Sequence, residues 1–112
     1  MHELSLAEQV LRQVQETAQI ERLRSVHRVS LEIGSLALVE QEALRFYFDI
    51  LSKESIAAGA KLEIKEREAR GICNICGEQV KLKQIYDTCS KGHQDLDVVS
   101  GMELLITELE AN

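Results

Sequence analysis

The sequence contains no proline, and its 112 residues include no low-complexity linker or internal repeat. A chain of this length suits one modest domain, and an apolar content of 45% is enough to bury a core. Because nothing resembles a tether between domains, we expect any second module to be an insertion within the fold.

Runs of lysine or arginine are also absent, and 19 acidic residues outnumber 13 basic ones, which gives a formal charge of −6. Such a chain has no basic surface that could bind the phosphates of a nucleic acid and release their counterions. We therefore expect no binding to nucleic acid. No stretch approaches the roughly 18 consecutive apolar residues of a membrane helix, and the first residues lack the charged and apolar regions of a signal peptide. We therefore expect a soluble, cytoplasmic protein that does not enter a membrane.

Cysteine is scarce, and all three cysteines lie in one short segment. An odd number of cysteines in a cytoplasmic chain favours metal ligation over disulfide bonding. Cys73 and Cys76 form a Cys-x-x-Cys turn, and Cys89 and His93 follow in a second turn, so the two turns would supply four ligands to one tetrahedral Zn²⁺. Gly77 can adopt a positive φ, which would let the first turn close. We predict a structural zinc site at Cys73, Cys76, Cys89 and His93.

The fourth zinc ligand departs from the simplest pattern. A second Cys-x-x-Cys turn would place cysteine at position 92, where the chain has Gly92, and His93 is the only histidine nearby. If water or another group completed the site instead, the open position would be typical of a zinc hydrolase. The sequence has no His-Glu-x-x-His motif to support that alternative.

Hydrophobic periodicity predicts two helices and three strands. A capping box at Ser5–Glu8 begins a helix over about 5–20, which leaves Met1 to Leu4 just outside it, and a second apolar stripe predicts a helix over 40–51. Alternation predicts strands over 26–33, over 61–65, and within the last dozen residues from Met102 onward. We expect an α/β (α+β) fold in which a small three-stranded sheet packs on two helices. Residues 1–68 and 100–112 would form this domain, with residues 69–99 inserted as a zinc-binding module.

The first residues, Met1-His2-Glu3, could form a second metal site. A free α-amine, the amide nitrogen of His2 and its imidazole can bind one ion through fused rings, and such nitrogen-rich planar sets suit Ni²⁺ or Cu²⁺ better than Zn²⁺. The alternative is an ordinary frayed terminus with a solvated histidine.

Several motifs in order resemble one family along essentially the whole chain. They are the opening Met1-His2-Glu3-Leu4-Ser5, the strand end Leu31-Glu32-Ile33-Gly34, Val39-Glu40 before a helix, and the late cysteine segment before a final strand. Together they resemble the HypA/HybF family of nickel metallochaperones. The resemblance implies a protein that is not an enzyme and that delivers Ni²⁺ to [NiFe]-hydrogenase, and in some members to urease.

The resemblance also implies sites and partners. Nickel would bind at the N-terminus through Met1, His2 and Glu3, with Glu40 as a possible additional ligand. Partners would be a HypB-type GTPase and a hydrogenase large subunit or urease maturation proteins, and a homodimer is possible. The family's structural zinc site usually has four cysteines, so this chain matches at Cys73, Cys76 and Cys89 and departs at Gly92. A different class of function, a zinc-ribbon interaction module that never binds nickel, stays open.

Overall fold

The computed structural model describes residues 2–84 and 86–112, and the chain divides into two compact units. The first unit comprises Met1–Leu31, Val39–Lys65 and Leu105–Asn112, and the second comprises Glu32–Leu38 and Glu66–Leu104. The elements in chain order are α1 (Glu3–Glu21), β1 (Val26–Gly34), the short 3₁₀ helix η1 (Ser35–Ala37), α2 (Gln41–Ser52), β2 (Lys61–Arg67), β3 (Ala69–Cys73), β4 (Gln79–Leu82), β5 (Leu96–Ser100) and β6 (Leu104–Ala111).

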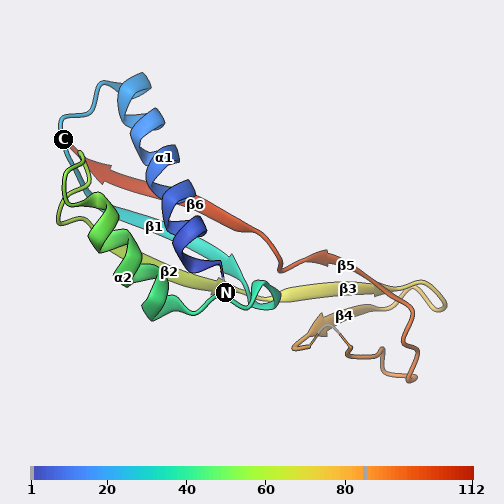
Figure 1. Ribbon diagram of the computed structural model, residues 1–112. Coiled ribbons are helices and arrows are strands. Elements are labelled where there is room, and N and C mark those ends of the chain that lie inside the picture. Colours follow the sequence, from blue (N-terminus) through green and yellow to red (C-terminus); the bar gives the residue numbers. More distant parts are fainter. Residues whose placement is uncertain (1, 85) are drawn as a thin grey trace. The chain divides into compact units, whose positions relative to one another are not determined.

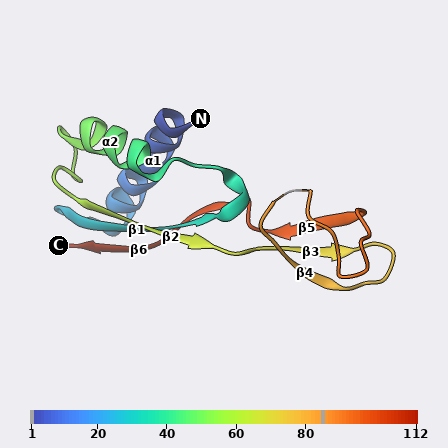
Figure 2. The ribbon, with the colours of Figure 1, turned by 90° about the horizontal axis from the view of Figure 1, so that it is seen from below.

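The first unit is a sheet with the order β2-β1-β6, covered on one face by α1 and α2 (Figures 1 and 2). Strand β1 is central, and its alternating burial places Val29, Leu31 and Ile33 in the core. Strands β1 and β6 run antiparallel, because Asn112 N donates to Ser25 O at the start of β1. The predicted fold class, a three-stranded sheet on two helices, is confirmed.

Helix α1 begins earlier than predicted. The backbone carbonyl of His2 accepts from Leu6 N at 2.7 Å, so helical hydrogen bonding starts at residue 2, and Ser5 lies inside the helix instead of capping it. His2 is the N-cap, and its side chain makes no capping hydrogen bond. The expectation that Met1 to Leu4 lie outside the helix is therefore wrong for Glu3 and Leu4, and Met1 lies outside the described residues. A tertiary contact that hydrophobic periodicity does not report lies at this first turn, where the Glu3 carboxylate accepts from the backbone N–H of Glu40.

Helix α2 matches its predicted range to within one residue at each end. Glu40 is the N-cap, and its carboxylate accepts from Glu42 N at 2.9 Å, which satisfies one of the free N–H groups of the first turn. Leu44 and Phe48, one turn apart, are fully buried. None of the helices in the described part of the chain is long and apolar enough to cross a membrane.

The last strand begins at Leu104, two residues later than predicted. Gly101 has φ +107°, and the Glu103 carboxylate accepts from the backbone N–H groups of Gly101 and Met102 at 2.8 and 2.7 Å. These contacts fold residues 101–103 into a turn that the apolar alternation could not reveal. The turn lies against Gly34, where an added Cβ would come within 2.0 Å of the Gly101 backbone.

The second unit contains a sheet that the sequence did not predict, with the order β4-β3-β5. Both neighbours of β3 are antiparallel to it, with Ala69 opposite Leu82 and Cys73 opposite Leu96. Its apolar core is small and centres on Leu36, Ala69 and Leu82. A core of this size leaves much of the unit's stability to other interactions.

Candidate metal centre

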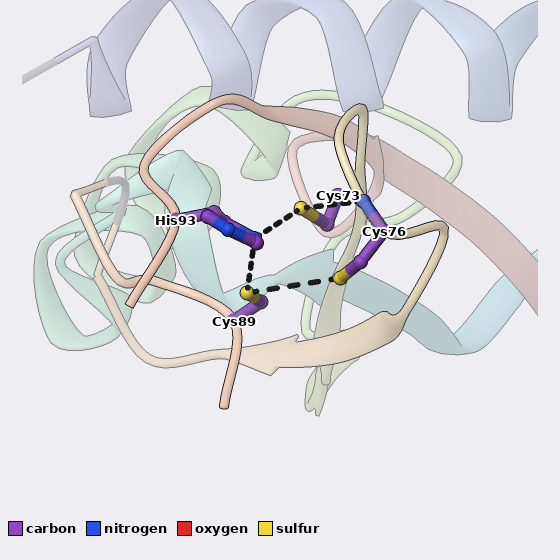
Figure 3. Close-up of side chains that lie close together, drawn as sticks. All are labelled: Cys73, Cys76, Cys89 and His93. Atoms are coloured by element: carbon purple, nitrogen blue, oxygen red, sulfur yellow. Dashed lines mark hydrogen bonds between the residues drawn. The ribbon is translucent and has the colours of Figure 1, made fainter. Parts of the chain in front are cut away.

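The three cysteines and His93 converge in the second unit (Figure 3). Cys73 ends β3, Cys76 lies in the following turn, and Cys89 and His93 come from the loop before β5. One ligand atom from each of the four residues lies within 4.8 Å of the others. Cys73 and Cys89 are buried, and Cys76 is exposed.

The distances within this cluster fit a tetrahedral ion. His93 Nδ1 lies 3.6 Å from Cys73 Sγ and 3.3 Å from Cys89 Sγ, and the Sγ atoms of Cys76 and Cys89 are 3.9 Å apart. A tetrahedron built from Zn–S bonds of about 2.3 Å and a Zn–N bond of about 2.0 Å has edges of about 3.8 Å between sulfurs and about 3.5 Å between sulfur and nitrogen. The donor set, three thiols and one imidazole, is also one that structural Zn²⁺ accepts.

The first turn is shaped by backbone hydrogen bonds around Cys73. Its carbonyl accepts from Gly77 N at 2.8 Å, its own N–H donates to Glu78 O at 2.9 Å, and its sulfur accepts from Cys76 N at 3.5 Å. Gly77 has φ +76°, as the sequence predicted. The N–H group aimed at the sulfur favours its charged form.

The second turn closes differently. Cys89 N donates to His93 O at 3.1 Å, and Gly92 N donates to Cys89 O at 2.9 Å. Gly92 has φ +85°, a conformation that a cysteine at that position would adopt only with strain. This backbone explains why glycine suits position 92 while His93, one residue further, brings its Nδ1 to the cluster.

The thiols of Cys73 and Cys76 differ in acidity. Burial opposes ionisation of Cys73, but hydrogen bonds from the backbone of Cys76 and Ile75, and then from the side chains of Cys76 and His93, lower its pKa to about 6. The backbone hydrogen bond near Glu78 favours the thiolate of Cys76, yet the side chain of Cys73, burial and the side chain of Cys89 outweigh it and raise the pKa of Cys76. The backbone hydrogen bonds therefore favour the thiolate of Cys73 over that of Cys76.

A carboxylate joins the two turns, and sequence reasoning missed this role. Glu78 accepts from both the N–H and the hydroxyl of Ser90, with the N–H contact at 2.7 Å. The hydrogen bonds from the Ser90 hydroxyl and then from its N–H lower the pKa of Glu78. Asn74 makes a second link, donating from its side chain to Asp95 and Asp97. No sequence signal identifies these pairs, because their partners are 12 or more residues apart.

The candidate nickel ligands are arranged less compactly. Met1 lies outside the described residues, and His2 is exposed at the start of α1. Glu3 is only 9% exposed, and its Oε2 accepts from Glu40 N at 3.0 Å, so the structure brings the Glu3 side chain to the start of α2. Within the described residues, His2, Glu3 and Glu40 do not form a cluster of the kind seen at the cysteines.

The carboxyl group of Glu3 is strongly acidic. The positively charged start of the chain, followed by the hydrogen bond from Glu40 N, outweighs the effect of burial and lowers the pKa of Glu3 to about 2. Glu3 is therefore ionised throughout the physiological range. A carboxylate that is held in this way fixes the first turn of α1 against α2.

Comparison with known proteins gives a consistent result over the whole length. The chain is 46% identical over 111 residues to the hydrogenase maturation factor HypA of Acidithiobacillus ferrooxidans, with 98% of each chain covered. It is 44% identical to the protein of the same name from Azotobacter chroococcum mcd 1, again with 98% of each chain covered. The solution structure of the Ni metallochaperone HypA from Helicobacter pylori matches with a TM-score of 0.74 at 23% identity, covering 99% of this chain and 97% of that one, and this likeness shows the fold.

The family model described as hydrogenase/urease nickel incorporation, metallochaperone, HypA matches residues 1–111. The match takes in both the first unit, with its N-terminal residues, and the cysteine cluster of the second. The chain therefore belongs to the HypA family of nickel metallochaperones.

Proposed function

We propose that this chain binds Ni²⁺ at its N-terminus and delivers it during maturation of [NiFe]-hydrogenase. The observation that carries the proposal is the match of the HypA family model to residues 1–111, together with relatives at 40% to 46% identity that are named hydrogenase maturation factors. Those names favour hydrogenase over urease as the enzyme served. They also favour a metallochaperone over the zinc-ribbon interaction module.

Nickel is the cargo in this proposal, and its ligands come from the first three residues. The α-amine of Met1, the amide nitrogen of His2 and the His2 imidazole would bind it, with carboxylate oxygens of Glu3 or Glu40 as supplementary ligands. The exposure of His2 supports this assignment, because a donor must release its ion to a partner. Protons compete for the same nitrogens, so nickel affinity should fall as the pH falls.

A structural Zn²⁺ held by Cys73, Cys76, Cys89 and His93 completes the proposal. The fit of the four ligand atoms to a tetrahedron supports zinc, and the small apolar core of the second unit supports a role in folding. Four protein ligands would leave no open position for a reactive water, so we propose that the chain is not an enzyme. We propose that residues 69–99 act as the zinc module and residues 1–68 with 100–112 as the nickel-binding domain.

A family member of this kind works with other maturation proteins. We propose a HypB-type GTPase and the hydrogenase large subunit as the specific partners, in the cytoplasm. The first helix and the N-terminus would lie at the GTPase contact, because nickel must pass over a short distance.

Blocking the α-amine tests the proposal. A variant extended by Gly-Ser before Met1 should lose nickel binding, keep its zinc content, and fail to restore hydrogenase activity to a strain that lacks the chain. The same extension placed after Asn112 is the matched control and should retain both functions. Unchanged nickel affinity and hydrogenase activity after the N-terminal extension would contradict the nickel proposal. That result would favour the zinc-ribbon interaction module instead.

A further inference from the structure

Strand β6 is an edge of the sheet in the first unit. In the order β2-β1-β6 it has β1 on one side only, so its outward backbone N–H and C=O groups have no partner strand within that sheet (Figure 1). Natural edge strands are commonly protected by charged side chains, especially lysine, or by proline, and β6, with the sequence LLITELEA, carries glutamates but no lysine or proline. An edge of this kind is suited to accept a further strand.

An open groove runs alongside β6. It has a volume of about 700 Å³ and lies between the second half of α1 and β6, both in the first unit. Its apolar lining comes from α1, from the residues just after it, and from β6: Ile20, Leu23, Ile106, Leu109 and Ala111. Ile20 is 79% exposed, an unusual exposure for a large apolar side chain. A strand added to β6 could place alternate side chains in this groove.

The remaining lining residues decide which kind of strand fits. Glu16, Glu21 and Glu108 are the charged residues that line the groove, and its described lining includes no basic side chain. Glu108 and Glu110 share the guanidinium of Arg28, at 3.7 and 2.9 Å, yet their side chains remain 66% and 60% exposed. A second copy pairing through its own β6 would bring Glu108 and Glu110 of both chains together, and like charges on paired edges are destabilising. The charge therefore favours a basic partner over self-association.

We propose that the edge of β6 and the α1–β6 groove bind an extended segment of another protein in which apolar and basic residues alternate. The segment adds to the sheet as a strand through main-chain hydrogen bonds, and its apolar side chains fill the groove. Its basic side chains, on the opposite face of the added strand, meet Glu108 and Glu110 of β6. The residues of this surface include neither those of the cysteine cluster nor the proposed nickel ligands.

A synthetic peptide tests the proposal on the full-length, zinc-loaded protein. The probe is a capped peptide as long as β6 that alternates valine with lysine, and the control peptide has the same composition with its lysines gathered at one end. We expect the alternating peptide alone to shift the NMR signals of residues 105–111 and to slow hydrogen exchange of their outward amides. Ile20→Ser should weaken binding about tenfold, because the apolar contact is lost. Phe46→Ser, at an exposed apolar residue of α2, is the matched control and should leave binding unchanged.

Three outcomes would overturn the proposal. Equal binding of the two peptides would show attraction by charge alone. Equal affinity of Ile20→Ser and the native protein would show that the groove is not used. Protection of the β6 amides that grows with protein concentration and without peptide would show that a second copy is the occupant.

Discussion

His93 stands beside a glycine at the place where a four-cysteine site would have its last thiol. The structure gives a backbone reason, because residue 92 has φ +85° and residue 93 brings a ring nitrogen to within 3.6 Å of two sulfurs. A site with one imidazole carries one negative charge fewer than a site with four thiolates. Spacing alone predicted that these four residues would gather, whereas their ligation of zinc stays a prediction.

Replacing His93 by alanine should weaken zinc binding and loosen residues 69–99, because metal binding supplies folding energy to a unit with a small apolar core. Zinc affinity by chelator competition and X-ray absorption at the zinc edge measure the effect. The native spectrum should contain three sulfurs and one nitrogen, and the variant should lose the nitrogen. An unchanged spectrum would place the fourth ligand elsewhere.

Other contacts around the cluster could not be predicted from the sequence. In the sequence, Glu78 is an ordinary polar residue that follows the Cys-x-x-Cys turn. Its contact with Ser90 depends on how the two ligand-bearing turns face each other in space. Similarly, the role of Glu3 at the start of α2 depends on a contact with Glu40, 37 residues away. Local patterns encode ligand types and spacing, but long-range hydrogen bonds follow only from the fold.

Helices and strands were predictable where one face is consistently apolar. Strand β1 alternates from Val29 to Ile33 and α2 has a clear apolar stripe, so both were located to within one residue. Strands β3, β4 and β5 bury few large side chains, and the buried positions of β3 are Ala69, Gly71 and Cys73. Their pairing is set by backbone register around the cysteine turns, which hydrophobic periodicity does not report.

Phe48 tests the packing of α2 in the first unit. Its side chain is fully buried, so Phe48→Ala should lower the free energy of unfolding by about 3–5 kcal/mol. Phe46 is 61% exposed on the same helix, and Phe46→Ala should change stability by less than about 0.5 kcal/mol. Urea unfolding of both variants at constant zinc provides the measurement. Equal losses would contradict the assignment of the buried face.

Glu103 gives the turn before β6 a pH dependence. Hydrogen bonds from the backbone of Glu103 itself, of Gly101 and of Met102 lower its pKa below the usual 4.5. A lowered pKa in the folded state stabilises the protein fully above the unfolded value, and this stabilisation is lost as the pH falls through the folded value. Glu103→Gln should therefore lower Tm at pH 7, and its difference from the native protein should shrink below about pH 4. A difference that stays constant over this range would contradict the role of the ionised carboxylate.

For the molecule as a whole, the two proposed sets of metal ligands belong to different units. The soft thiolates and His93 belong to the second unit, whereas His2, Glu3 and Glu40 belong to the first. The sequence predicted two separate sites from ligand chemistry, and their separate metal binding stays a prediction. The division explains how a chain could keep one structural ion while it exchanges another.

Nickel titration of His2→Ala, with zinc content measured on the same samples, tests the central claim most directly. His27→Ala is the matched control, because His27 is another exposed histidine in the first unit. The account predicts that His2→Ala loses nickel binding and keeps its zinc, while His27→Ala binds both ions as the native protein does. Native nickel affinity in His2→Ala would contradict it.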